Sequence, residues 1–119
     1  MPYNFQQYEN FVFELSKRDG KPLDFKRGLS LVGLGLTGEA GEVADLIKKI
    51  LHHNKLLDGE TEKKLIIELG DILWYVTFLA HHLGYELDEI AEANIKKLQK
   101  RFPSGAFTPT EASAKADEA

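Results

Sequence analysis

The chain has 119 residues, 43% of them hydrophobic, which suits a single compact domain with its own core. A net charge of −4 argues against a general nucleic-acid binder or membrane-surface binder, both of which need an excess of basic residues. The chain has no cysteine, so disulfides, thiolate metal sites and cysteine nucleophiles are excluded, and a reducing cytoplasm is compatible with this composition.

The first predicted helix begins after Asn4 and ends at about Ser16. Asn4 and Gln7 have the spacing of a capping box, in which each side chain bonds to the backbone N–H of the other residue. Apolar residues then recur at helical spacing at Tyr8, Phe11, Val12 and Leu15. The charged and Gly/Pro-containing residues 18–22 indicate a break. No basic-then-apolar leader precedes this helix, so we expect a cytoplasmic protein without a secretory signal.

The second predicted helix runs from near Phe25, with Asp24 as its cap, to about His53. It carries an unusual number of glycines, and each costs up to ~1 kcal/mol relative to alanine inside a helix. These glycines are Gly28, Gly33, Gly35, Gly38 and Gly41. Two explanations stay open at this point. Either the helix is interrupted near residues 33–38, or the glycines allow another backbone or a ligand to approach closely.

The third predicted helix runs from about Glu60 to Leu83 and ends at Gly84, a typical C-terminal glycine. It is apolar on almost every side, which favours a subunit interface over part of its surface. The run of residues 65–83 is nearly long enough to cross a membrane, but it contains Glu68 and Asp71. We therefore interpret it as a core helix and expect no membrane partner.

The fourth predicted helix runs from about Glu86 to Phe102 and is stopped by Pro103. Its apolar residues, expected to face inward, are Leu87, Ile90, Ala91, Ile95 and Leu98. The remaining residues, 103–119, are rich in Ala, Ser, Thr, Gly and Pro, which is typical of a flexible tail. The sequence thus predicts an all-α four-helix bundle over residues 1–102.

Two short acidic motifs stand out, one on the second helix and one on the third. Glu39 and Glu42 form the first pair, and Glu68 and Asp71 form the second. Residues three apart on a helix project from nearly the same side. If the two helices pack together, the four carboxylates make an all-oxygen cage suited to Mg²⁺ or Mn²⁺.

The surroundings of these acids strengthen that interpretation. Glu39 shares its direction on the helix with Val43, Leu46 and Ile50, near the middle of the apolar stripe. The residues four positions after the acids are all apolar or aromatic, so no local ion pair is available. Burying an unpaired carboxylate costs several kcal/mol, roughly the penalty for any ion removed from water. A bound metal ion would offset that cost.

Asn94, Lys97 and Arg101 lie within a roughly 60° arc of the fourth helix. An amide and two cations near a carboxylate-bound metal suit a polyphosphate, because lysine supplies a point charge and arginine binds two oxygens. The same cations are also favoured at a helix C-terminus by the helix dipole. Taken alone, the pattern is more typical of a solvated helix end.

Taken together, four segments resemble the MazG-type nucleotide pyrophosphohydrolases, an all-α family. The segments are Gly35–Val43, Glu68–Tyr75, Leu83–Gly84 and Ala93–Phe102, and the resemblance spans about residues 27–102. It implies a helical bundle that works as a homodimer or homotetramer. It further implies cleavage of a nucleoside triphosphate between the α and β phosphates, with Mg²⁺, or Mn²⁺ as a substitute.

The resemblance also implies roles for individual residues. The Mg²⁺ ligands would be Glu39, Glu42, Glu68 and Asp71, and the substrate contacts would be Asn94, Lys97 and Arg101. One of the acids would accept the proton of the attacking water, with Glu39 or Glu42 as our hypothesis. Trp74 could stack on the nucleobase, although core packing is the commoner role of a tryptophan on so apolar a helix.

Three alternatives remain. A phosphoribosyl-ATP pyrophosphohydrolase would perform the same type of reaction on another substrate. A di-iron carboxylate bundle uses Glu-x-x-His motifs, and neither acidic motif here ends in histidine. A non-enzymatic helical interaction module would show no dependence on a divalent metal. The sequence does not distinguish among nucleotides, and a role in cleaning the nucleotide pool rests on the resemblance alone.

Overall fold

The computed structural model describes residues 3–52, 58–107 and 109–110. It contains α1 (Phe5–Ser16), α2 (Phe25–His52), α3 (Gly59–His82) and α4 (Leu87–Arg101). Within the described ranges, β pairing is limited to an isolated bridge between Arg18 and Lys21, so the all-α prediction is confirmed. The chain divides into two compact units, residues 1–85 with α1 to α3 and residues 86–119 with α4.

Local capping interactions set the helix starts close to where the sequence predicts them. The Asn4 side chain accepts from the Gln7 backbone N–H at 2.8 Å, and the Asn4 N–H donates to Gln7 Oε1 at 2.9 Å, which completes the capping box. Asp24 Oδ1 accepts from the Arg27 N–H at 2.9 Å at the start of α2. Asp58 Oδ1 accepts from the Thr61 N–H at 2.7 Å ahead of α3. Of the predicted helix ends, His53 lies outside the described residues.

A Schellman motif ends α3, as the glycine after it predicts. The Gly84 N–H donates to the His81 carbonyl at 2.9 Å, and the Tyr85 N–H donates to the Ala80 carbonyl at 2.8 Å. Gly84 has φ = +88°, a left-handed conformation that residues with a side chain adopt only at a cost. The glycine therefore fixes where the long helix stops.

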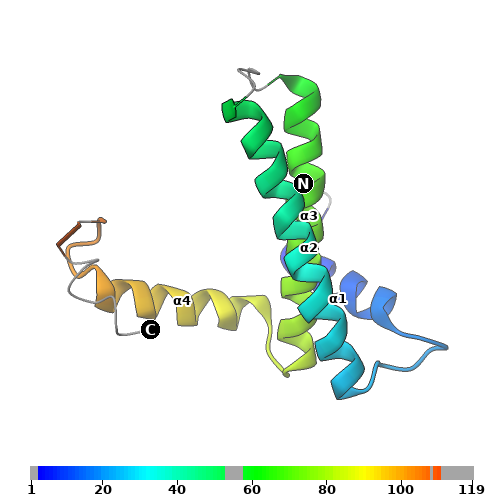
Figure 1. Cartoon of the computed structure of the whole chain (residues 1–119). Coiled ribbons are helices and arrows are strands. Elements are labelled where there is room, and N and C mark those ends of the chain that lie inside the picture. Colours follow the sequence, from blue (N-terminus) through cyan, green and yellow to red (C-terminus); the bar gives the residue numbers. More distant parts are fainter. Residues whose placement is uncertain (1–2, 53–57, 108, 111–119) are drawn as a thin grey trace. The chain divides into compact units, whose positions relative to one another are not determined.

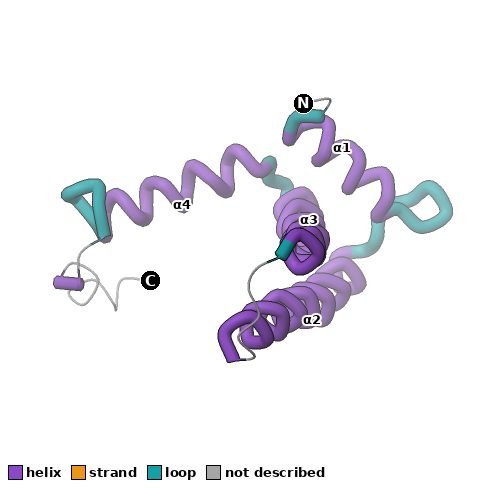
Figure 2. Tube along the Cα trace, turned by 90° about the horizontal axis from the view of Figure 1, so that it is seen from above, coloured by secondary structure: helices purple, strands orange, loops and turns teal. Residues whose placement is uncertain are grey.

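The five glycines do not interrupt α2, which is continuous from Phe25 to His52, so that alternative is wrong. A close approach is present at two of them, but a side chain makes it rather than a backbone or a ligand. A Cβ at Gly28 would overlap the His82 ring, and a Cβ at Gly35 would overlap the Tyr75 ring. The close neighbours are thus side chains of α3, which lies alongside α2 (Figures 1 and 2).

The core of the first unit forms where α1 and α2 both pack on α3 (Figure 2). Val12, Val32 and Phe78, one from each helix, are buried against one another. Half-buried side chains surround them: Tyr8, Leu23, Leu31, Leu36, Trp74, Tyr75 and Leu79. The His82 ring stacks on Phe78 and Phe25, with centroids 5.2 Å apart in each case, and its Nε2 lies 2.9 Å from the Phe25 carbonyl oxygen. This contact ties the end of α3 to the start of α2.

Large apolar side chains remain exposed on several helices. On α3, Ile67 is 64% exposed, and Ile66 and Leu69 are also exposed. On α4, Leu87 is half-buried, but the other residues expected to face inward are exposed, among them Ile95 at 55%. No helix in the described ranges is both long enough and apolar enough to cross a membrane.

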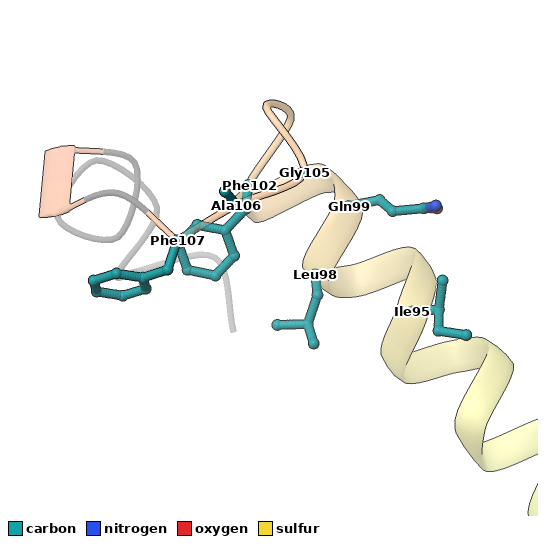
Figure 3. A pocket seen from close by; sticks show the side chains of 7 residues that line it. All are labelled: Ile95, Leu98, Gln99, Phe102, Gly105, Ala106 and Phe107. Carbon is teal, nitrogen blue, oxygen red and sulfur yellow. The ribbon is translucent and has the colours of Figure 1, made fainter.

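The start of the expected tail folds back on α4. The Gly105 N–H donates to the Phe102 carbonyl at 2.9 Å, and the rings of Phe102 and Phe107 lie 5.3 Å apart. These residues and the last turns of α4 surround a shallow apolar hollow (Figure 3). Of the predicted tail, residue 108 and residues 111–119 lie outside the described part of the chain.

Candidate functional site

Three of the four predicted acids converge between α2 and α3. Each of Glu39, Glu68 and Asp71 offers a carboxylate oxygen, and these oxygens all lie within 4.8 Å of one another. Glu39 and Glu68 are half-buried, whereas Asp71 is exposed. The predicted meeting of the two acidic motifs is thus present in the fold.

The register of the two antiparallel helices explains why these residues meet. Gly28 faces His82, and Gly35, seven residues later on α2, faces Tyr75, seven residues earlier on α3. A further turn in the same register brings Glu39 opposite Asp71. The glycines let the helices approach closely, so the acids that follow them are held near one another.

The fourth acid, Glu42, is placed differently from the other three. The same register sets it opposite Glu68, but it is exposed and is not one of the converging carboxylates. Its charge nevertheless contributes to raising the pKa of Glu39. Glu42 therefore lies at the edge of the cluster, and its role as a metal ligand remains a prediction.

The surroundings of Glu39 raise its pKa from 4.5 to about 7. The main cause is a side-chain hydrogen bond with Glu68, followed by burial and by the charges of Asp71, Glu68 and Glu42. Such a bond between two carboxyl groups requires a proton on one of them. Without a cation, the cluster therefore retains a proton close to neutral pH.

One oxygen of the cluster lacks a protein partner. Glu68 Oε2 is buried and accepts no hydrogen bond. An orphaned buried carboxylate oxygen is costly unless it meets a positive group. An all-oxygen donor set from rigid helices suits Mg²⁺ or Mn²⁺, so the residues present fit a divalent metal ion.

A cavity of about 360 Å³ opens beside the acids. Its lining combines charged, aromatic and aliphatic residues: Leu15, Arg18, Leu31, Glu39, Asp71, Trp74 and Tyr75. The Trp74 ring stacks on Phe78 at 5.6 Å and meets the Tyr75 ring edge-on at 5.3 Å. The Trp74 Nε1–H is buried and has no hydrogen-bond partner. Trp74 thus packs in the core and also lines the cavity.

Sequence reasoning missed two residues near this site. Burial raises the pKa of Tyr8 on α1, with a further contribution from the charge of Asp71. Arg18 lines the cavity from the loop that joins α1 to α2. Their positions depend on how α1 packs on the other helices, which cannot be predicted from a local sequence pattern.

The three residues predicted on the fourth helix lie on α4, in the second unit. Asn94 and Lys97 are exposed. Arg101 is half-buried, and its guanidinium carbon lies 5.7 Å from the centroid of the Phe102 ring. Their contact with a substrate remains a prediction.

The fold and the site define an all-α protein with a carboxylate centre shared by two antiparallel helices. The chain matches the family model described as the MazG nucleotide pyrophosphohydrolase domain over residues 28–106. It is also 43% identical over 85 residues to the Gene 37 protein of Mycobacterium phage L5, covering 71% of this chain and 75% of that protein. No solved structure matches the chain significantly. The chain belongs to the MazG nucleotide pyrophosphohydrolase family, which confirms the resemblance read from its sequence.

Proposed function

We propose that this protein hydrolyses a nucleoside triphosphate at the α–β phosphoanhydride bond, giving the monophosphate and pyrophosphate. The observation that supports this most directly is the convergence of Glu39, Glu68 and Asp71 at the wall of an open cavity. Membership of the MazG family supports the reaction class. That the substrate is a nucleoside triphosphate is our proposal and goes beyond the family match.

The acids have two tasks in this proposal. Glu39, Glu68 and Asp71, with Glu42 at the edge, hold the divalent ion, Mg²⁺ or Mn²⁺. When bound, such an ion offsets the negative charge of the phosphates and makes water more acidic. Glu39 or Glu42 accepts the proton of the attacking water as the water oxygen bonds to the α-phosphorus and the bond from that phosphorus to the bridging oxygen breaks. Pyrophosphate leaves with the electron pair of the broken bond.

The remaining predicted residues position the nucleotide. Trp74 lines the cavity wall, and its aromatic ring suits contact with a base or sugar. Asn94, Lys97 and Arg101 contact the phosphates or ribose, and the family match includes all three positions. We also propose a cytoplasmic role in cleaning the nucleotide pool.

A homodimer or homotetramer is part of the same proposal. The support is the exposure of large apolar side chains on α3 and α4, among them Ile67 and Ile95. Burying such residues against a second copy would remove their apolar surface from water.

The proposal is tested by measuring pyrophosphate release from common and modified nucleoside triphosphates, with Mg²⁺, with Mn²⁺ and with EDTA. We expect metal-dependent release with an equal amount of monophosphate. Glu68→Gln is expected to lower kcat by at least about 100-fold, the usual scale for losing one preorganised charge at a reacting site. Glu62→Gln, which changes an exposed acid on the same helix outside the cluster, is the matched control.

Silence across the whole panel, from folded protein that binds Mn²⁺, would contradict a nucleoside triphosphate as the substrate. Phosphoribosyl-ATP is the next compound to assay in that case. Equal activity with and without EDTA would contradict the metal centre itself.

A further inference from the structure

The loop between α1 and α2 holds an arginine in a defined position. Arg18 and Lys21 form an isolated bridge, with the Arg18 N–H to Lys21 carbonyl at 2.9 Å and the reverse bond at 3.1 Å. Between them, Asp19 and Gly20 both have positive φ, +55° and +73°, the pattern of a tight type I′ turn. The turn therefore fixes the backbone of Arg18 just beyond the end of α1.

The guanidinium group of Arg18 is also held in place. Its Nη1 donates to the carbonyl oxygens of Ser16 at 2.9 Å and Lys17 at 3.2 Å. These two bonds use only Nη1, and the donors on Nε and Nη2 remain for another acceptor. No carboxylate of a described residue forms an ion pair with Arg18 or with Arg27. The positive charge of both side chains is thus available to an anion.

Arg18 connects two neighbouring hollows. It lines the cavity that contains Glu39 and Asp71, and it also lines a second hollow of about 290 Å³. The second hollow is surrounded by Arg18, Leu23, Arg27, Ser30 and Leu31. Because Arg18 and Leu31 belong to both linings, the hollows adjoin, with carboxylates in the first and two arginines in the second.

We propose that Arg18 and Arg27 form an anion-binding subsite that holds the terminal phosphates of a nucleoside triphosphate. The inference rests on the proposed function and deepens it, because it specifies which end of the substrate lies where. Each guanidinium group can donate two parallel hydrogen bonds to the oxygens of a phosphate. Ser30 adds a hydroxyl donor to the same hollow. The α–β bond then lies near the acids, and the nucleoside lies toward Trp74 and Tyr75.

This arrangement makes the enzyme select for the length of the phosphate chain. A triphosphate spans both hollows, whereas a monophosphate near the acids leaves the arginines without an anion. The departing pyrophosphate is the part of the substrate that the two arginines hold. The subsite therefore distinguishes triphosphates from shorter nucleotides without contacting the base.

The first test measures the binding of inorganic tripolyphosphate by calorimetry, in the presence of saturating Mg²⁺, with the full chain. We expect Arg18→Gln and Arg27→Gln each to weaken binding about tenfold, the usual effect of losing one charge-assisted contact. Arg18→Lys retains the charge and should recover part of the loss. Lys26 lies beside Arg27 in the sequence and carries the same charge, but it lines neither hollow. The Lys26→Gln protein should therefore bind tripolyphosphate as tightly as the wild type.

The second test separates this inference from the proposed function. With a triphosphate substrate, KM should rise about tenfold in both arginine variants while Mn²⁺ affinity stays unchanged. Wild-type tripolyphosphate affinity in both variants would overturn the subsite, even if the enzyme hydrolyses triphosphates. Arginine-dependent binding in a protein that hydrolyses none of the substrates would support the subsite and overturn the proposed function.

Discussion

The ring of Tyr75 on α3 occupies the space that a side chain at Gly35 on α2 would need. One helical turn further along the pair, Glu39 and Asp71 meet at the acidic cluster. The packing of a ring on a glycine and the placement of the carboxylates are therefore parts of one helix–helix contact.

Gly35→Ala tests that relationship. The added methyl group overlaps the Tyr75 ring, and overpacking of this kind typically costs about 1–3 kcal/mol. Gly38→Ala is the matched control, because its Cβ meets nothing and alanine favours a helix by up to ~1 kcal/mol. Urea unfolding of both variants gives the comparison. Equal stability of the two variants would show that the close contact is unimportant.

The raised pKa of Glu39 predicts how the stability of the metal-free protein depends on pH. The folded state retains a proton up to about pH 7, whereas an unfolded chain releases it near 4.5. The stabilising contribution of this group is therefore complete below about pH 4.5 and is lost as pH rises through 7. We expect the free energy of unfolding in EDTA to fall between about pH 4.5 and 7 and to level off above that range. Glu39→Gln, which does not titrate, should flatten that fall, and an unchanged slope would refute this assignment.

Metal binding should be coupled to proton release at the same carboxyl group. A metal ion needs the charged form of Glu39, so Mn²⁺ affinity should increase from pH 6 to pH 8. Calorimetry in buffers of different ionisation enthalpy measures the number of protons released. Below pH 7 we expect release approaching one proton per ion, and Asp71→Asn should weaken binding strongly. A pH-independent affinity would argue against Glu39 as a ligand.

Trp74→Phe tests the unpartnered indole N–H. Phenylalanine retains a ring that can stack on Phe78, and the N–H that it removes makes no protein hydrogen bond. We expect the free energy of unfolding to change by about 1–2 kcal/mol at most. The smaller ring destabilises the core, whereas removal of a buried N–H without a partner stabilises it. KM for the nucleotide should rise several-fold. Steady-state kinetics with an unchanged KM would confine Trp74 to core packing.

Much of the fold was predictable because its determinants are local. The capping pairs at Asn4 and Asp24 and the glycine at the end of α3 act within a few residues, so the helix limits follow from short patterns. The acidic pairs were predictable for the same reason, since spacing alone puts Glu68 and Asp71 on one side of a helix.

The rest depends on contacts between distant residues. Which glycines meet side chains depends on the register of α2 against α3. The exposed position of Glu42, outside the converging acids, also depends on how the two helices pack. Arg18 reaches the cavity because a tight turn follows α1. Inward-facing residues on α4 were predicted from periodicity, which identifies an apolar face but not the surface that covers it.

The α2–α3 pair is a long hairpin whose two halves are stabilised by different forces. Near His82 and Tyr75 the helices are joined by ring-to-backbone contact, whereas at Glu39 and Glu68 they are joined by a hydrogen bond between two carboxyl groups, which needs a retained proton. A cation bound at these carboxylates, as we propose, would replace that proton and would hold the far half of the hairpin together more firmly. Amide hydrogens of residues 43–52, which need not touch the ion, should exchange with solvent more slowly when it is bound.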